Sequence, residues 1–365
     1  MMTCGCRDRD MLCMSRRYDY VRWDNFFGVP SVKRVKVGKL HDSREKVVII
    51  TGGSSGIGRC TARLFASHGW KVGIIARGLP AMQATAQDVR DQGGCAAIVE
   101  ADVTDTAALE AAADSIISQL GPVDVWINCA GTGIYGRFDD VRENEFQRVT
   151  DVTYHGTVNG TRIALRHMRP RGQGCIVNVC SAIAFHGVPL LSSYAGAKGA
   201  VRSFTQAIRG ELRLEKSHVR ICSVFPAAMN TPFFSHALSH MGWPARPAKP
   251  IYKPEVAAEG IWLAARSNHS ELFITGTTEL FSLATRFMPG VIGWCVSQLG
   301  MERQLTRDHR AIELCEPTLF HPSDRVRGGR WPFNHQARGW SIQVWLLGLR
   351  QAICMRIRKM LRMTH

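Results

Sequence analysis

The chain has 365 residues, of which 45% are hydrophobic and 21% are charged. This composition is close to the globular average and excludes a disordered chain, a collagen and a coiled coil. At roughly 100–200 residues per domain, the length fits one large domain or two small ones. No stretch of about 18 uncharged apolar residues occurs, so the sequence predicts no membrane-spanning helix.

The excess positive charge is concentrated at the two ends of the chain. Residues 1–45 carry 10 basic and 6 acidic side chains, residues 46–285 carry 23 and 19, and residues 286–365 carry 13 and 5. A basic tail indicates an anionic partner, which is phospholipid, nucleic acid or an acidic protein. The 12 cysteines show no CxxC pair and no zinc-ligand spacing. We therefore expect reduced thiols, a cytoplasmic location and no metal site.

From Lys46 onward, short apolar runs alternate with helical segments. Strands are predicted over residues 46–50, 71–76, 96–101, 123–128, 175–181, 219–225 and 271–276. Helices are predicted over residues 57–68, 80–92, 105–120, about 140–170, 192–216 and 255–267. This alternation, with nearly continuous Val and Ile in the strands, predicts an α/β fold whose parallel sheet is covered on both faces.

Two extensions flank the catalytic domain that we expect at residues 45–285. Residues 1–44 show no sustained period and predict a flexible, basic N-terminal extension. Residues 286–365 end in Trp340–Met363, where apolar residues at helical spacing and five basic residues predict an amphipathic helix. Three roles remain open for this helix: packing on its own domain, lying on an anionic membrane surface, and binding nucleic acid, which no recognised motif supports. The second role would add a membrane-associated form to the cytoplasmic location.

The first strand leads into the sequence TGGSSGIG at residues 51–58, and a helix follows. Gly52, Gly56 and Gly58 allow the backbone to come close to a pyrophosphate and to the helix. The helix N-terminus offers unpaired N–H groups and the positive end of its dipole to that phosphate. A glycine-rich loop at a strand–helix junction therefore predicts a dinucleotide site.

The second strand ends in Ala76 and is followed by Arg77. Sites that prefer NAD usually place Asp or Glu here, to bind the ribose hydroxyls. A guanidinium instead matches the 2′-phosphate of NADP by charge and geometry. The sequence therefore predicts NADP(H) as the cofactor, with Arg77 on the 2′-phosphate. Arg59 is a second candidate, which we expect on the helix surface.

Tyr194 and Lys198 are spaced i and i+4, so they share one face of a predicted helix. An unperturbed tyrosine, with a pKa of about 10, is a poor base at neutral pH, and a nearby ammonium would favour its phenolate. Ser181 ends the fifth strand and can hydrogen-bond the same substrate oxygen. This set predicts that Tyr194 exchanges a proton with a carbonyl or alcohol while hydride moves.

With these motifs in this order, the chain resembles the short-chain dehydrogenase/reductase (SDR) family, in its TGxxxGxG and YxxxK branch, over about residues 45–280. The resemblance implies one Rossmann-type, doubly wound domain with a seven-stranded parallel sheet, and often a homo-oligomer. It implies that Tyr194 is the general acid/base, that Lys198 binds the nicotinamide ribose and lowers the tyrosine pKa, and that Ser181 orients the substrate oxygen. It also implies that Tyr194, like Lys198, binds the cofactor. The further cofactor-binding residues that it implies are Ser54, Ser55, Ile57, Asp102, Val103, Asn128, Ala130, Gly131, Pro226 and Thr231.

The sequence departs from the family pattern at two positions. Thr153 stands where the family usually has an Asn that helps to hold a water in a proton relay, and we expect Thr153 to take this catalytic role. Ala227 stands where the family usually has Gly after Pro226, which costs φ freedom but keeps the backbone N–H. Neither departure removes the Ser/Tyr/Lys set.

The expected substrate is a small hydrophobic ketone, aldehyde or alcohol. Apolar and aromatic loop residues would rim the nicotinamide end, namely Phe185, His186, Val188, Met229, Phe233, Phe234 and Trp243. Two alternatives to this NADP(H)-dependent oxidoreductase remain open. One is a 3-oxoacyl-carrier-protein reductase, whose acidic carrier would need a basic patch such as Arg166, Arg169 and Arg171. The other is a nucleotide-sensing protein with weak catalysis, which only Thr153 supports.

Overall fold

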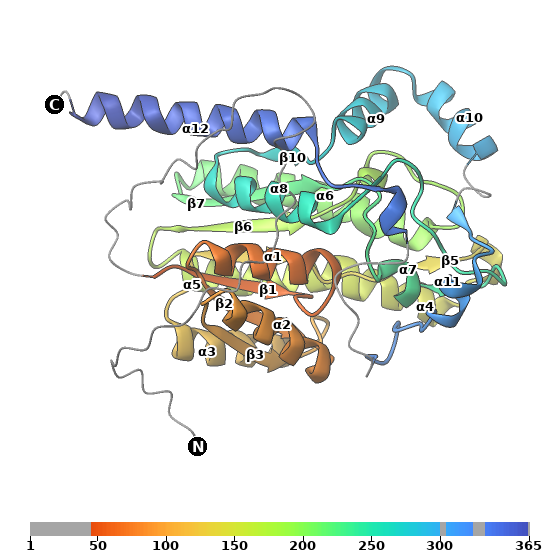
Figure 1. Cartoon of the computed structure of the whole chain (residues 1–365), viewed down its shortest axis with the longest axis horizontal. Helices are drawn as coiled ribbons and strands as arrows, with labels where there is room; N and C mark the ends of the chain where they lie inside the picture. The colour runs from red at the N-terminus through yellow and green to blue at the C-terminus, as the bar shows by residue number, and fades with distance from the viewer. Residues whose placement is uncertain (1–44, 300–303, 324–332, 364–365) are drawn as a thin grey trace. The chain divides into compact units, whose positions relative to one another are not determined.

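The computed structural model describes residues 45–299, 304–323 and 333–363 (Figure 1). The flexible extension that we predict at residues 1–44 lies outside the described residues.

A seven-stranded sheet forms the centre of this domain, and all of its neighbouring strands are parallel (Figure 1). The strand order β10-β7-β6-β4-β1-β2-β3 confirms the predicted Rossmann-type fold. Because the chain proceeds from β1 to β2 on one side and to β4 on the other, a crevice opens at the carboxyl ends of β1 and β4, where ligands bind in such sheets. The strands are β1 (Val47–Thr51), β2 (Lys71–Ala76), β3 (Ala96–Glu100), β4 (Val125–Asn128), β6 (Gly174–Val179), β7 (Val219–Phe225) and β10 (Glu271–Phe273).

Helices cover both faces of the sheet. Strand residues alternate between two buried clusters: Val48 and Ile50 of β1 point into one cluster, and Val47 and Ile49 into the other. The first cluster is closed by α1 (Gly56–Ser67), α2 (Leu79–Asp91) and α8 (Pro254–Arg266). The second is closed by α3 (Thr106–Leu120), α5 (Gly156–Met168) and α6 (Ser192–Leu214).

Two predicted segments differ in detail from the structure. The seventh strand ends at Phe273 rather than at residue 276, because Thr275 caps the next helix by accepting a hydrogen bond from the Thr278 N–H. The helical region at 140–170 is divided into α4 (Glu143–Thr150), a π-helical turn η3 (Asp151–His155) and α5. The π turn contains Thr153, the position at which the sequence departs from the family pattern.

The chain after β10 adds four helices to the described structure. They are α9 (Gly276–Phe287), α10 (Pro289–Leu299), α11 (His309–Glu313) and α12 (Ile342–Met363), so the helix predicted near the C-terminus is present. The boundary expected at residue 285 falls inside α9. The first turns of α12 pack on the domain, because Val344 is buried in the same cluster as α8 and the Ser341 hydroxyl donates to the Ile274 carbonyl at 2.7 Å.

Short pairs of strands tie the loops together at the carboxyl edge of the sheet. β5 (Ile134–Tyr135) pairs with β8 (Leu238–Ser239), and β9 (Ile251–Tyr252) pairs with β11 (Ala337–Arg338). Among the described helices, none by itself has the length and apolar composition to cross a bilayer. Only α9 and α10 together, which are bent by 120°, meet that criterion.

Candidate active site

A cavity of about 750 Å³ lies at the carboxyl ends of the strands. Its lining runs from the glycine loop, past the ends of β2 and β3, to Tyr194 and Lys198 on α6. At its other end it is lined by side chains of α7 (Phe233–His236), α9 and α10. The expected dinucleotide loop and the expected catalytic residues therefore share one cavity, whose volume is typical of ligand sites.

The glycine loop has the close-packed geometry that a pyrophosphate site requires. Gly52 and Gly56 have φ angles of +70° and +50°, a region that side-chain-bearing residues rarely adopt. A Cβ atom at Gly58 would overlap the carbonyl oxygen of Gly52, so the helix and the loop approach closely only with glycine there. The first turn of α1 contains no acidic residue, which leaves its N–H groups and dipole to an anion. Ser54, Ser55 and Ile57 also line the cavity.

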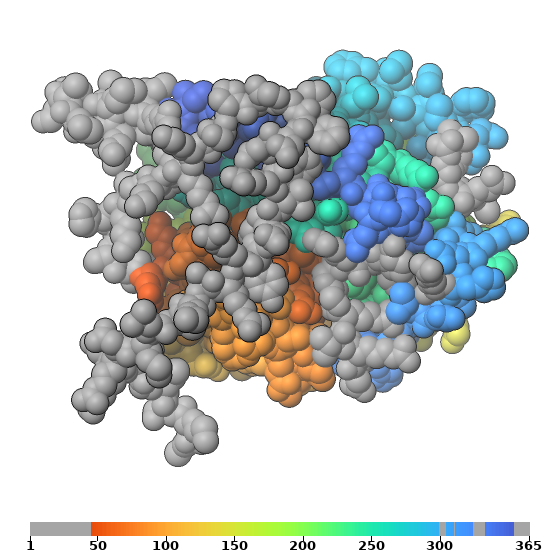
Figure 2. Space-filling model, in the orientation of Figure 1, coloured from red at the N-terminus to blue at the C-terminus, as the bar shows by residue number. Residues whose placement is uncertain are grey.

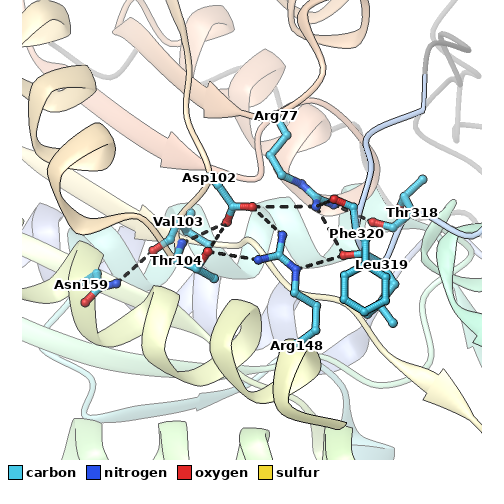
Figure 3. A network of polar contacts seen from close by, with 9 residues as sticks. All are labelled: Arg77, Asp102, Val103, Thr104, Arg148, Asn159, Thr318, Leu319 and Phe320. Carbon is cyan, nitrogen blue, oxygen red and sulfur yellow. Dashed lines mark hydrogen bonds and ion pairs between the residues drawn. The ribbon is translucent and has the colours of Figure 1, made fainter. Parts of the chain in front are cut away.

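Arg77 lies at the outer end of this site and takes part in a network of polar contacts (Figure 3). Its guanidinium donates to three consecutive carbonyl oxygens of the C-terminal segment: Thr318 at 2.6 Å, Phe320 at 3.1 Å and Leu319 at 3.3 Å. Arg59, the second candidate, instead pairs with Asp88 at 2.7 Å on the other side of α1. The structure thus separates the two arginines that the sequence left as candidates.

Arg148 of α4 joins the same network (Figure 3). Its guanidinium contacts the Asp102 carboxylate at 2.5 Å, the Thr104 hydroxyl at 3.0 Å and the Leu319 carbonyl at 3.1 Å. Asp102 also lies 3.9 Å from Arg77 and accepts a hydrogen bond from the Thr104 N–H. One carboxylate is therefore shared by two guanidinium groups.

The charges of this network leave one excess cation at the end of the cavity. Burial alone would raise the pKa of Asp102, but the hydrogen bonds from Arg148 and Thr104 hold it below its ordinary value. Burial and the neighbouring Arg148 lower the pKa of Arg77, and Asp102 opposes them. An arginine stays charged at neutral pH because its ordinary pKa exceeds about 12. Two positive groups facing one negative group favour an anionic ligand here.

The catalytic candidates lie together in the middle of the cavity. Ser181 caps the short turn η4 (Ala182–Ala184) and lies close enough to the Tyr194 hydroxyl to lower the pKa of the phenol. The Lys198 ammonium lies 5.7 Å from the centre of the Tyr194 ring and donates to the Val179 carbonyl at 2.8 Å. The end of β6 and one face of α6 therefore bring the three predicted side chains to one place.

Burial dominates the electrostatics of Tyr194 and Lys198. It raises the pKa of Tyr194 above its ordinary value, and the neighbouring Ser181 hydroxyl offsets only part of this rise. Burial lowers the pKa of Lys198. The expectation that the ammonium lowers the tyrosine pKa stays a prediction for the cofactor-bound site, because in this structure desolvation of the phenolate sets the direction of the shift. Tyr194 is held in its protonated form, which is the form that donates a proton.

We expect carbonyl reduction at this site to be insensitive to pH from about pH 6 to pH 9 and to decline at higher pH. The Tyr194 phenol donates the proton, and burial raises its pKa. The phenol therefore loses its proton to solvent only when the pH rises through that raised value. Deprotonation of Lys198 at high pH would also lower the rate of reduction. The measurement is kcat/KM for reduction against pH, with circular dichroism at each pH as the folding control. A fall in kcat/KM between pH 6 and pH 8 would contradict this assignment.

Thr153 is buried, and its hydroxyl is hydrogen-bonded to the backbone of Thr132. Its hydroxyl accepts from the Thr132 N–H at 3.3 Å and donates to the Thr132 carbonyl at 3.2 Å. Gly131 lies beside both Thr153 and Lys198, since a Cβ atom there would be 3.8 Å from the hydroxyl of Thr153 and 3.7 Å from the ammonium of Lys198. In the structure Thr153 holds the loop after β4 in place next to Lys198.

The remaining cofactor candidates divide between the cavity and the interior. Val103, Ala130, Gly131, Pro226 and Thr231 line the cavity, as does Asp102. The Asn128 side chain does not line it. Its amide accepts from the Trp126 indole at 2.8 Å and donates to Asn178 at 2.8 Å, within the protein interior. Asn128 thus joins β4 to β6 below the site.

Apolar side chains make up most of the cavity lining, which also includes Arg246 and Lys249. Of the rim residues that the sequence suggested, Val188, Met229, Phe233 and Phe234 line the cavity, whereas Phe185, His186 and Trp243 do not. The Phe233 ring stands 5.2 Å from the Tyr194 ring. Sequence reasoning missed the α9 and α10 side chains of this lining, namely Thr277, Thr278, Phe281, Ile292, Cys295 and Val296.

Sequence reasoning also missed Arg148 and the carbonyls of Thr318, Leu319 and Phe320. A single arginine on an amphipathic helix resembles a solvent-exposed one, and backbone carbonyls have no side-chain signature. The one available signal was the charge of Asp102, which was expected at the site, because a half-buried carboxylate favours a cationic partner.

Comparison with known proteins relates this site to one family. A family model described as short chain dehydrogenase matches residues 46–241. The uncharacterized oxidoreductase YxnA of Bacillus subtilis is 34% identical over 263 residues, which cover 71% of this chain and 73% of YxnA. The 3beta-hydroxysteroid dehydrogenase 1 of Eggerthella lenta is 30% identical over 263 residues, which cover 68% of this chain and 97% of that enzyme.

Two solved structures share the fold. An alcohol dehydrogenase from the archaeon Thermococcus sibiricus, complexed with 5-hydroxy-NADP, matches with a TM-score of 0.55 and 25% identity over 63% of this chain and 96% of its own. A variant of actinorhodin polyketide ketoreductase with NADPH matches with a TM-score of 0.58 and 26% identity over 64% of this chain and 97% of its own.

Proposed function

Because the chain belongs to the short-chain dehydrogenase family of oxidoreductases, we propose that it is an NADP(H)-dependent enzyme for hydrophobic carbonyl compounds and the corresponding primary or secondary alcohols. The observation that carries this proposal is the Ser181–Tyr194–Lys198 group in the middle of a cavity with a glycine loop at one end and apolar side chains at the other. The bound nicotinamide would supply or accept the hydride.

The protein side chains would supply the proton and the orientation. In reduction, the protonated Tyr194 phenol donates its proton to the carbonyl oxygen as hydride reaches the carbon. Ser181 orients the same oxygen by a hydrogen bond, and its contact with Tyr194 brings the two hydroxyls together. Lys198 binds the nicotinamide ribose and places a positive charge behind the developing phenolate. Thr153 keeps the loop at Thr132 against this group and so acts as a positioning residue.

The preference for NADP(H) follows from the cationic network. Arg77 would bind the 2′-phosphate, and Arg148 neutralises Asp102, which would otherwise repel that phosphate. The structural neighbours that carry 5-hydroxy-NADP and NADPH support the same preference. A guanidinium fork matches phosphate geometry better than an ammonium does.

A hydrophobic substrate is favoured by the lining of the cavity beyond Tyr194. Phe233, Phe234 and Phe281 contribute aromatic rings, and Ile292 and Val296 contribute aliphatic surface. Such a lining favours a bulky apolar carbonyl compound over a small charged one. The named activities of two relatives, a 3beta-hydroxysteroid dehydrogenase and a polyketide ketoreductase, are compatible with this substrate class.

The two alternatives have less support. The arginines suggested as a site for an acidic carrier already have acidic partners, because Arg166 pairs with Glu110, Arg169 with Glu215 and Arg171 with Asp124. They lie in the last turn of α5 and just after it, at the amino ends of the strands and opposite the cavity. A nucleotide sensor without chemistry would not require the contact between Ser181 and Tyr194 beside an apolar pocket.

We also propose an anionic membrane surface as the partner of α12. Trp345, Leu346 and Leu349 of this helix are exposed, while Val344 is buried against the domain. A helix with one apolar face outward and basic residues along its length is suited to the membrane interface. The other interpretation, packing on the domain, describes the Val344 side of the same helix.

The enzymatic proposal is tested by NADPH oxidation in a panel of hydrophobic ketones and aldehydes, with NADH in parallel. We expect turnover of at least one bulky apolar carbonyl compound with NADPH, and slower turnover with NADH. Small charged 2-oxo acids serve as the contrasting substrates. Turnover of these acids alone, or equal rates with both cofactors, would contradict the proposal.

A further inference from the structure

The exposed apolar side chains of the described structure gather on the helices that follow β10. Of the nineteen large hydrophobic side chains that are exposed, six lie on α9, α10 and their junction, and six lie at α12. The α9–α10 group is Leu280, Leu283, Phe287, Met288, Val291 and Trp294, and we call it the outer face. Figure 2 shows α9 and α10, in light blue, forming an uncovered surface at the upper right of the view. Contiguous apolar surface of this kind marks an interaction site.

The opposite side of the same two helices faces the substrate end of the cavity. Phe281 of α9 and Ile292, Cys295 and Val296 of α10 line the cavity that also contains Tyr194. Leu280, Leu283 and Phe287 are spaced i, i+3 and i+7, so they share a face different from that of Phe281. The helix pair is therefore apolar on both sides, and it alone separates this part of the cavity from the outer face.

The dimensions of the pair suit a membrane surface rather than a membrane span. With 12 and 11 residues, α9 and α10 are about 18 Å and about 16 Å long, whereas the hydrocarbon core of a bilayer is about 30 Å thick. The 120° bend between them also prevents a continuous span. Helices that expose Leu, Phe and Trp on one face are suited to lying in the interfacial plane. Exposed tryptophans, here Trp294, Trp340 and Trp345, are typical of that depth.

The charge of the adjoining C-terminal segment identifies the kind of surface. α9 and α12 are linked by the hydrogen bond from the Gln343 amide to the Glu279 carboxylate at 2.6 Å, and Figure 1 shows α9 and α10 beyond the N-terminal end of α12. After Asp324 the sequence contains nine Lys or Arg residues and no Asp or Glu. Anionic phospholipid complements this charge. A second copy of the chain would bring like charges together, which disfavours pairing through this face.

We propose that the outer face and the exposed side of α12 dock on an anionic lipid surface, with α9 and α10 forming the entrance through which a membrane-dissolved substrate reaches Tyr194. The docking is independent of the enzymatic proposal. The entrance rests on that proposal, because it presumes a hydrophobic carbonyl or alcohol substrate.

The docking is tested with the full-length protein and vesicles of phosphatidylcholine with and without phosphatidylglycerol. We expect co-sedimentation with the anionic vesicles that weakens as salt is raised toward 1 M, where the Debye length falls to about 3 Å. The double variant Leu283→Asp/Val291→Asp should weaken vesicle partitioning by about tenfold or more for each apolar side chain removed from lipid. The matched control is Leu214→Asp, since Leu214 is 87% exposed at the end of α6 and outside the outer face. It should bind as the wild type does.

Fluorescence quenching by brominated lipid distinguishes insertion of apolar side chains from electrostatic attraction alone. Brominated lipid should quench part of the tryptophan fluorescence, because it quenches tryptophans that enter the bilayer. The Trp294→Phe variant should lose part of that quenching. Unchanged binding of the double variant, or wild-type protein that ignores anionic vesicles, would overturn the docking proposal. A change of oligomeric state in the double variant without vesicle binding would identify a second copy as the occupant and would also overturn it.

The entrance is tested separately. The measurement is KM for a hydrophobic carbonyl compound carried in vesicles, compared with KM for a water-soluble carbonyl compound. The double variant should raise KM for the vesicle-borne compound and leave KM for a water-soluble carbonyl compound unchanged. Equal effects on both would refute the entrance. Absence of any NADPH oxidation would instead refute the enzymatic proposal, while vesicle binding would still report on the docking.

Discussion

Replacement of Tyr194 by Phe should reduce kcat by about 10²–10⁴-fold, which is the usual contribution of a general acid. The phenol is held protonated by burial and lies beside Ser181, so its loss removes the proton donor while the aromatic ring remains. NADPH binding should be retained, because the phenylalanine ring still packs on Phe233 and the glycine loop is untouched. The measurements are steady-state kinetics of NADPH oxidation and a fluorescence titration with NADPH.

The matched control for this variant is Tyr154→Phe. Tyr154 packs on Phe204 outside the cavity lining, so loss of its hydroxyl should leave turnover and cofactor affinity as they are. Equal turnover of Tyr194→Phe and the wild type would remove Tyr194 from the mechanism and favour the nucleotide-sensing alternative. Loss of NADPH binding in Tyr194→Phe would assign the phenol to the cofactor instead.

Sequence reasoning was most successful where the chemistry depends on short spacings. The glycine loop, the spacing of Tyr194 and Lys198, and the alternation of strands and helices are local patterns, and each follows from the backbone geometry of one helix or one strand. The parallel sheet then brings Ser181 to Tyr194, because the carboxyl ends of its strands lie at one edge. For this reason the proximity of Ser181, Tyr194 and Lys198 could be predicted without the structure, while their roles stay a prediction.

Contacts between distant parts of the chain could not be located in this way. Arg77 meets Thr318 across 241 residues, and Arg148 meets Leu319 across 171. Both contacts are made to backbone carbonyls, which every residue carries. The inward turn of Asn128 has a similar cause, because its partner Asn178 is 50 residues away on the neighbouring strand. Burial likewise sets the direction of the Tyr194 pKa, and burial is a property of the folded protein.

Replacement of Arg77 by Ala should weaken NADPH binding by about 10- to 100-fold and leave NADH binding almost unchanged. The variant would lose a charge-assisted hydrogen bond to the 2′-phosphate, worth about 1.5–3 kcal/mol, and tenfold in affinity corresponds to about 1.4 kcal/mol. NADH has no 2′-phosphate, so its affinity provides an internal reference. The measurement is titration with each cofactor, followed by intrinsic tryptophan fluorescence.

The control is Arg59→Ala, which removes an arginine that is close in sequence but paired with Asp88. It should keep the wild-type preference for NADPH. Arg77→Lys is informative as well, because an ammonium keeps the charge and loses the planar fork, so it should give intermediate NADPH affinity. An equal loss of NADPH and NADH affinity in Arg77→Ala would mean that the arginine acts through the carbonyls of Thr318, Leu319 and Phe320. In that case it would stabilise the C-terminal segment over the site rather than recognise the phosphate, and thermal unfolding of the variant would show a lowered Tm.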